Sequence, residues 1–361
     1  MVSCSVIDDR LSKANLTGYS DVVPALTSIT VEGFKSIASV KLSLRPINIL
    51  IGSNGSGKSN FIEVFELSQV LRKAMHDKKQ LQNYVGKAGG ANKILHFGAK
   101  TTPLISIRLV FENQYNMWFE VASTQDDSLY ISKNIDSAWE VEDRPGEWQI
   151  YHFEDTSPSS ALRRTARVDD NRFLRADGSN LASFLYFLKK KHPLSYGLIR
   201  QTIQRVAPFF DDFELEPLWL NEEDIKLQWR HKNSDQYFNA SSLSDGTLRF
   251  IALAALFLQP TEFLPSVILV DEPELGLHPY AIEMLASLIR QASKSAQVIV
   301  STQSPLLLDY FSPEDILVAN RVNGATQIER LDPAPLAVWL QDYSLGQLWE
   351  KNEIKGRPTP E

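Results

Sequence analysis

The chain has 361 residues, with 37 Lys and Arg against 44 Asp and Glu, so its formal net charge is -7. This length allows one large domain or two, and the 43% hydrophobic content excludes a disordered or collagen-like chain. The single cysteine, Cys4, excludes an internal disulfide framework and favours a reducing compartment, so we expect a cytoplasmic protein. No run approaches the roughly 18 apolar residues of a membrane span. The acidic balance argues against coating nucleic acid with the whole surface, but it allows a local basic groove.

The first hundred residues are predicted to hold strands and one helix. Residues 1–27 are polar and weakly patterned, and we interpret them as an extension. Strand patterns begin at Ser28. The apolar run 47–51 reads as a strand, and a Gly/Ser cluster and a helical stretch follow it. Residues 76–100 contain several glycines and are predicted to be mostly loop.

The middle of the chain changes from strands to helices. Apolar residues alternate at 105–111 and 117–121, and Trp148 and Ile150 continue the pattern, which predicts an antiparallel meander. After a charged, turn-rich stretch, residues 181–209 are predicted to be helical. A return to strands follows at 213–230.

The last third of the chain alternates strands and helices. A long apolar helix at 247–258 leads to a strand at 267–270, and an amphipathic helix follows. Two more strands are expected at 298–301 and 316–319. Strand–helix–strand repetition of this kind predicts a parallel sheet.

A glycine-rich segment after the predicted strand 47–51 matches the phosphate-binding pattern G-x-x-x-x-G-K-[ST]. Its glycines let consecutive N–H groups curl around phosphates at the positive end of the next helix. We expect Lys58 to reach the β- and γ-phosphates and the Ser59 hydroxyl to bind Mg²⁺. The alternative is a turn that contains Lys-Ser by chance, but the strand and helix flanks favour a nucleotide site. The predicted nucleotide-binding residues are Gly52, Ser53, Asn54, Gly55, Ser56, Gly57, Lys58, Ser59 and Asn60.

Two carboxylates end the apolar strand 267–270. Asp271 can hold the Mg²⁺ water shell beside the phosphate loop, and Glu272 can orient or deprotonate the attacking water. Ligands of open α/β sheets bind at such carboxyl ends of strands. The alternative is an ordinary surface turn. Because the same chain also contains a phosphate loop, we favour the catalytic site.

A third element, Ser244, Asp245 and Gly246, opens the helix 247–258. It places a hydroxyl and exposed N–H groups at a helix start, which is a second anion site. The alternative is a simple helix cap. Its place shortly before the acidic strand favours the anion site.

Together these stretches resemble an ATP-binding-cassette ATPase of the SMC/RecF-like group, and more closely the short stand-alone bacterial predicted AAA-family ATPases. The resemblance covers about residues 28–320. It is carried by 29–44 (containing Gly33-Phe34-Lys35-Ser36), 52–59, 241–249, 267–279 and 298–309, with a weaker match at 176–181. It implies an α/β fold of the P-loop NTPase, ABC-ATPase head type, with a mixed central sheet, an antiparallel β lobe and a helical insertion.

The resemblance also predicts a division into four parts. An N-terminal extension at 1–27 precedes a Walker A half with the antiparallel β lobe at 28–153. A helical insertion lobe follows at 154–240. The signature, Walker B and switch-loop half fills 241–361. The middle has no room for the long coiled coil of a true SMC protein.

The resemblance further implies ATP and Mg²⁺ as cofactors and a homodimer that closes around two ATP molecules. Ser244, Asp245 and Gly246 would face the nucleotide held by a second copy of the chain. Residues 275–278 occupy the D-loop position at the interface. Gln303 occupies the switch loop and is a candidate catalytic residue beside Glu272. Lys35 and His278 are possible further site residues, with a structural role for His278 equally open.

The sequence departs from the family pattern in three ways. The signature reads LSDGT, so Asp245 brings negative charge to a predicted anion site. Gln303 can donate a hydrogen bond but cannot exchange a proton as histidine does, which predicts slow turnover. The Q-loop glutamine is not identified, and the candidates are Gln69, Gln80, Gln82 and Gln114.

Two function hypotheses follow from these residues. The first is an ATP-driven dimerising switch that acts on DNA, in repair or in defence against foreign DNA. The second is a regulatory ATPase that gates an effector protein encoded nearby, a nuclease or toxin, without binding DNA. A transporter ATPase subunit is less favoured. Basic residues that could line a DNA groove, or be ordinary solvated charges among acids, are Arg163, Arg164, Arg167, Arg172, Arg175, Lys189, Lys190 and Lys191.

Overall fold

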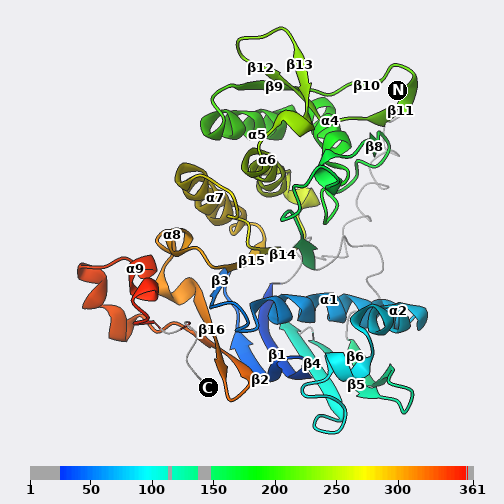
Figure 1. Cartoon of the computed structure of the whole chain (residues 1–361), viewed down its shortest axis with the longest axis vertical. Helices are drawn as coiled ribbons and strands as arrows, with labels where there is room; N and C mark the ends of the chain where they lie inside the picture. The colour runs from blue at the N-terminus through cyan, green and yellow to red at the C-terminus, as the bar shows by residue number, and fades with distance from the viewer. Residues whose placement is uncertain (1–24, 113–115, 137–147, 355, 357–361) are drawn as a thin grey trace, which may run out of the picture.

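The computed structural model describes residues 25–112, 116–136, 148–354 and 356. Its larger sheet contains six strands in the order β17-β16-β3-β15-β14-β7 (Figure 1). All neighbours in this sheet are parallel except β16 and β17. The strands are β3 (Ile47–Ile51), β7 (Trp148–Tyr151), β14 (Val267–Asp271), β15 (Gln297–Thr302), β16 (Ile316–Val322) and β17 (Ala325–Arg330).

The second sheet is antiparallel and has five strands in the order β2-β1-β4-β5-β6. Its burial alternates along β1 and β4, as expected for a sheet with one face in the core. By contrast, all six residues of β15 are buried, which is typical of a parallel strand covered on both faces. The antiparallel strands are β1 (Leu26–Phe34), β2 (Ile37–Ser43), β4 (Leu104–Phe111), β5 (Asn116–Ser123) and β6 (Leu129–Asp136).

Helix α1 (Lys58–Ala74) joins the two sheets through one hydrophobic core. Phe61 and Phe65 of this helix share the core with Val31 of the antiparallel sheet and Leu269 of the parallel sheet. The short helices α2 (Lys79–Ala88) and α3 (Ala91–Ile94) follow it along the chain. Packing on both sides fixes the start of α1, and therefore the phosphate loop, relative to the sheet.

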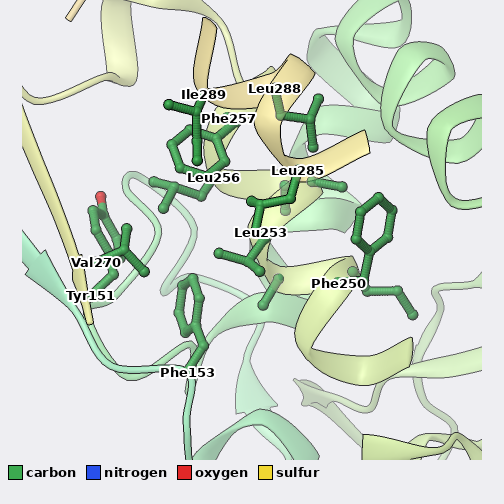
Figure 2. Packing of buried hydrophobic residues seen from close by; sticks show 14 of the residues in the cluster. Tyr151, Phe153, Phe250, Leu253, Leu256, Phe257, Val270, Leu285, Leu288 and Ile289 are labelled. Atoms are coloured by element: carbon green, nitrogen blue, oxygen red, sulfur yellow. The ribbon is translucent and has the colours of Figure 1, made fainter. Parts of the chain in front are cut away.

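A second core packs helices α6 (Asp245–Leu258) and α7 (Pro279–Ala292) against the opposite face of the parallel sheet. Figure 2 shows Leu253 of α6 and Leu285 of α7 close together, with Val270 of β14 and the rings of Tyr151 and Phe153 nearby. Each of these side chains is at most 3% exposed. This core holds the start of α6 close to the carboxyl ends of the strands.

The insertion lobe lies above α6, at the top of Figure 1. Its helices α4 (Leu181–Lys191) and α5 (Pro193–Val206) pack beside two three-stranded sheets. The small strands are β8 (Ala166–Arg167), β9 (Phe210–Glu214), β10 (Pro217–Leu218), β11 (Asn221–Ile225), β12 (Gln228–His231) and β13 (Tyr237–Asn239). The chain then returns through α6, and after β15 it forms α8 (Pro305–Leu308) and later α9 (Leu345–Glu350).

The predicted α/β fold with a mixed sheet, an antiparallel β lobe and a helical insertion is confirmed. Two local predictions were wrong. The glycine-containing stretch 76–100 holds α2 and α3, because Leu81, Tyr84 and Val85 are buried on one helix face. Trp148 and Ile150 belong to β7, which pairs in parallel with β14 and not with the meander. The predicted four-part division stays a prediction, and residues 1–24 of the extension lie outside the described residues.

Within the described ranges, no helix has the length and apolar character needed to cross a lipid bilayer.

Candidate phosphate and metal site

Three loops meet where the parallel strands end. β3, β15 and β14 are neighbours in register, so Ile51, Thr302 and Asp271 end their strands at the same edge of the sheet. The phosphate loop follows β3, Glu272 follows β14 and Gln303 follows β15. Residues that are far apart in sequence therefore share one edge, the edge at which open α/β sheets bind their ligands.

Lys58 is the first residue of α1 and is only 6% exposed. Its Nζ donates to the carbonyl oxygens of Gly52 (2.7 Å) and Ser53 (3.2 Å), so the loop closes around its own lysine. Burial lowers the pKa of the Lys58 ammonium, and the nearby carboxylates of Glu272 and Asp271 oppose this shift. A buried cation that faces a loop of backbone N–H groups is suited to bind phosphate.

The remaining loop residues occupy distinct positions. Asn54 and Gly55 are exposed at the tip, while the Ser56 hydroxyl is buried and unpaired within the described part of the chain. Gly57 has φ +103°, and a Cβ there would lie 2.0 Å from Thr326 Oγ1, so only glycine fits. Ser59, the second residue of α1, is exposed.

The Gly33-Phe34-Lys35-Ser36 turn packs directly against the start of α1. Asn60 Nδ2 donates to Ser36 Oγ (2.7 Å), and Lys35 forms an ion pair with Glu63. Ser36 also shares a 2.7 Å hydrogen bond with Thr326, whose hydroxyl donates to the carbonyl oxygen of Ser56. Lys35, a possible site residue, therefore lies beside the loop with its charge compensated by Glu63.

Asp271 has the properties expected of a Mg²⁺ ligand. Its Oδ1 is shielded from solvent and accepts no hydrogen bond from any residue in the described ranges. Burial raises the pKa of Asp271, the neighbouring Ser301 hydroxyl opposes this shift, and the carboxylate of Glu272 adds to it. An unpaired buried carboxylate oxygen is costly unless a cation or water occupies the site. Oxygen ligands from Asp271 and Ser59 suit Mg²⁺, so these residues fit the implied ion.

Glu272 and Gln303, predicted separately as catalytic residues, are in contact. Gln303 Nε2 donates to Glu272 Oε1. Glu272 has φ +41°, a conformation that costs a non-glycine residue of order 1–3 kcal/mol and that clusters at functional sites. Its N–H donates to Ser301 O at 2.8 Å, which ties the backbone of Glu272 to the end of β15.

Glu274 was missed by the sequence reasoning, although it lies in the 267–279 stretch. It is 7% exposed, and its Oε1 accepts hydrogen bonds from Thr302 Oγ1 (2.5 Å) and from the N–H of Gln303 (3.2 Å). Burial raises the pKa of Glu274. This residue therefore connects the D-loop to the switch loop and holds Gln303 toward Glu272.

The signature residues form the start of α6. Ser244 is the N-cap, and its Oγ accepts from the N–H of Thr247 at 3.2 Å. Asp245 pairs with Arg163 at 2.9 Å, and the same guanidinium donates to Ala240 O. The Arg163 side chain is 9% exposed. The negative charge that makes LSDGT unusual is thus compensated inside the same chain.

Gly246 connects the signature to the D-loop. A Cβ on Gly246 would lie 2.2 Å from Gly276 O, so the two segments touch through backbone atoms. Gly276 itself has φ +74°. His278 is the N-cap of α7, where its Nδ1 accepts from the N–H of Tyr280 at 3.3 Å. This contact gives His278 a structural role, while the ring stays exposed.

The segment after β7 also reaches this edge. His152 and Glu154 lie 3.5 Å apart, and this contact raises the pKa of His152. Arg249 of α6 is 5% exposed and donates to Phe153 O (3.0 Å) and Glu154 O (2.6 Å). These residues were also missed, although Arg249 ends the signature stretch.

The candidate Q-loop glutamines have other positions. Gln69 donates to Trp148 O at 2.7 Å, at the beginning of β7 and not at its carboxyl end. Gln80 and Gln82 are exposed on α2, and Gln114 lies outside the described residues. The residue that follows β7, the strand beside β14, is His152.

Half of the eight residues in the predicted basic cluster form ion pairs with acids. Arg167 pairs with Asp169 and Glu223, Arg175 with Asp170, and Lys189 with Asp212. Arg163 pairs with Asp245, and Arg164 donates to Ser159 O. Arg172 and Lys190 lie over the rings of Phe173 and Tyr186. These contacts favour the interpretation as ordinary surface charges.

The phosphate loop and the acidic strand end have the arrangement of a P-loop NTPase site. The family model described as "AAA domain, putative AbiEii toxin, Type IV TA system" matches residues 47–309, and the chain belongs to this family. The resemblance recognised in the sequence is therefore confirmed.

Solved structures of Smc heads have the same fold. An Smc head bound to the C-winged helix domain of ScpA is 16% identical, with a TM-score of 0.59, and covers 87% of this chain and 100% of that one. A Pyrococcus furiosus Smc head with an extended coiled coil, bound to the C-terminal domain of ScpA, is 14% identical, with a TM-score of 0.58, and covers 88% and 99%. A comparison with curated proteins found no match.

Proposed function

We propose that this chain is a Mg²⁺-dependent ATPase that dimerises on ATP and thereby gates a partner effector protein. The observation that carries the proposal is the contact between Glu272 and Gln303 at the strand edge that also holds Lys58. A carboxylate held beside a phosphate loop can orient and deprotonate a water molecule. Glu272 and Gln303 directly follow β14 and β15, so the paired strands fix the positions of both residues.

Each residue has a stated task in this proposal. The loop N–H groups and Lys58 bind the β- and γ-phosphates, and Ser59 and Asp271 hold Mg²⁺, which supplies charge neutralisation when bound. Glu272 accepts the proton of the attacking water. Gln303 orients Glu272 and, lacking a transferable proton, supports only slow turnover. Slow hydrolysis suits a switch, because the ATP state then lasts.

The D-loop and the signature support dimerisation. Leu275 and Tyr280 are 43% and 44% exposed on the segment that touches Gly246. Two large apolar side chains beside an N-capped helix start provide a surface for a second copy of the chain. Ser244 and Gly246 would then face the γ-phosphate on the other copy, with Arg163 reducing the repulsion from Asp245.

The choice of a protein effector over DNA rests on charge. Arg163, Arg167 and Arg175 of the predicted basic cluster pair with acids, and DNA binding needs unpaired cations that replace counterions. The family description, which names a toxin of a toxin–antitoxin system, adds support for an effector such as a nuclease or toxin. Action on DNA in repair or defence is the second candidate, and the cytoplasmic location stays a prediction.

The test is the Glu272→Gln variant, which keeps the shape of the side chain but removes the base. We expect it to bind Mg-ATP, to hydrolyse it at least about a hundredfold more slowly, and to accumulate as a dimer in light scattering. Lys58→Ala is the control, and it should neither bind ATP nor dimerise. If Glu272→Gln binds Mg-ATP but stays in its nucleotide-free oligomeric state, the dimerising switch is refuted.

A further inference from the structure

The C-terminal segment, meaning α9, residues 351–354 and Gly356, reaches the phosphate loop. The carbonyl oxygen of Gly356 accepts a hydrogen bond from the N–H of Ser53, with 2.8 Å between the two atoms. Ser53 is the second residue of the loop, which begins at Gly52. The two partners are distant in sequence, so only the fold brings them together.

Gly356 is held in a specific place beside the loop. Its N–H donates to Oδ1 of Asn320 in β16 at 2.8 Å, so both of its backbone polar groups are used. Its φ is +95°, and a Cβ there would lie 2.9 Å from Nε1 of Trp349 and 3.3 Å from Cγ1 of Val318. A residue with a side chain would be strained and crowded here, so the position requires glycine.

The residues just before Gly356 are anchored in the hydrophobic core. Ile354 is 4% exposed and belongs to the core that also contains α6 and α7. Leu348 of α9 is buried in the same core, and its carbonyl oxygen accepts from the N–H of Glu353 at 2.9 Å. Packing of these residues therefore supports the contact between Gly356 and the loop.

Helix α9 also contacts the helix that follows the switch loop. The N–H of Gly346 in α9 donates to Oδ1 of Asp309 at 2.7 Å. A Cβ on Gly346 would lie 2.3 Å from the carbonyl oxygen of Pro305, the first residue of α8. Since α8 begins two residues after Gln303, the C-terminal segment contacts both sides of the site.

The peptide unit between Gly52 and Ser53 is held from both sides. Lys58 Nζ donates to its carbonyl oxygen at 2.7 Å, and its N–H donates to the carbonyl oxygen of Gly356 at 2.8 Å. A peptide unit is planar, so its C=O and N–H groups can only turn together. If the contact with Gly356 is lost, this plane can rotate and the acceptor of Lys58 moves with it.

We propose that Gly356 is a positioning residue for ATP binding, because it fixes the peptide plane that holds Lys58. The inference rests on the proposed function and adds a role for the C-terminal segment to it. Gly356 acts through the loop and contacts no substrate. The loop binds phosphates in the ground state and in the transition state alike, so loss of the contact should raise the KM for ATP and leave kcat unchanged.

The experiment uses two variants of the full chain, Gly356→Ala and Asn320→Ala, which disturb the same contact from its two sides. We expect each to raise the KM for Mg-ATP about three- to tenfold, the loss of one hydrogen bond, with kcat within about twofold of the wild type. Calorimetry should show the same weakening for Mg-ATP and for Mg-tripolyphosphate, because the loop binds only the phosphates.

The chain offers a matched control for each variant. Gly89, at the end of α2, has φ +82°, but a Cβ there meets nothing within 4 Å. Gly89→Ala therefore introduces similar backbone strain away from the loop, and it should leave the KM unchanged. Gln327 is exposed on β17 opposite Asn320, and Gln327→Ala should also have no effect.

A shortened chain keeps the test decisive if Gly356→Ala does not fold. A chain that ends at Ile354 lacks Gly356 but retains the buried Ile354, and it should show the same rise in KM. An unchanged KM in Gly356→Ala or in this shortened chain, or a fall in kcat alone, would refute the positioning role while the phosphate site stands. If the wild type binds neither Mg-ATP nor Mg-tripolyphosphate, the proposed function itself fails.

Discussion

At the scale of single residues, Glu274 is a buried acid whose second oxygen, Oε2, has no hydrogen-bond partner in the described part of the chain. Its ionised form is costly, because burial disfavours the charge and raises the pKa above the ordinary value of 4.5. We predict that Glu274→Gln raises the free energy of unfolding by about 1 kcal/mol at pH 7.5, since the amide removes a buried charge.

The pH dependence of this effect follows from the direction of the shift. A carboxyl with a raised folded-state pKa destabilises the protein fully above that pKa, and the penalty disappears as the pH falls toward 4.5. The stability difference between Glu274→Gln and wild type, measured by urea unfolding, should shrink accordingly. Glu283→Gln, on the exposed face of α7, should show no such difference. A variant less stable than wild type at pH 7.5 would contradict the prediction.

At the scale of elements, the contact between α6 and the D-loop depends on Gly246. We predict that Gly246→Ala lowers the free energy of unfolding by about 1–3 kcal/mol, because its Cβ meets Gly276 O at 2.2 Å and backbone must move. It should also reduce the ATP-dependent dimer, since the displaced D-loop belongs to the proposed interface. Thermal unfolding and light scattering measure the two effects.

The chain contains a matched control for this substitution. Gly197 is also helical, on α5, but a Cβ there meets nothing within 4 Å. Gly197→Ala should therefore stabilise the protein by about 0.5–1 kcal/mol through helix propensity. Equal effects at both glycines would show that Gly246 acts through its own helix and not through the D-loop.

The elements that the sequence predicted well are those with a local signal. Alternating apolar residues in the sequence predicted β4 and β5, and continuous apolar runs predicted β14 and β15. The partner of β7 was missed because strand pairing is non-local. The helix α2 was missed because Gly86 and the glycines that follow the helix obscured its buried face.

The site residues also divide into those with a local sequence signal and those identified only by contacts in the fold. The loop at 52–59 and the pair Asp271-Glu272 have motifs, so sequence alone located them. Arg163 has none. Its importance comes from its contact with Asp245, a residue that is distant in sequence and meets Arg163 only after folding. A single sequence contains no local pattern for such pairs.

At the scale of the whole molecule, the acidic net charge and the paired arginines predict weak binding to nucleic acid. In gel-shift assays at roughly 0.15 M salt, we expect no complex with duplex or single-stranded DNA, with or without Mg-ATP. A complex that weakens as salt rises, and that is lost on combined substitution of Arg172, Lys190 and Lys191 by alanine, would favour the DNA hypothesis. The dimeric Glu272→Gln variant is tested in parallel, since two copies could join small basic patches.

The position of β3 in the sheet has a consequence for biosynthesis. β3 precedes the phosphate loop, yet both of its neighbours, β15 and β16, come from the last third of the chain. The phosphate loop therefore leaves the ribosome long before β15 and β16 are synthesised. During that time the apolar residues of β3 have no neighbouring strands to pair with. Such long-range pairing slows folding and favours capture by chaperones. In the proposed function ATP binds only the assembled loop, so the nucleotide would stabilise the folded protein and not its nascent forms.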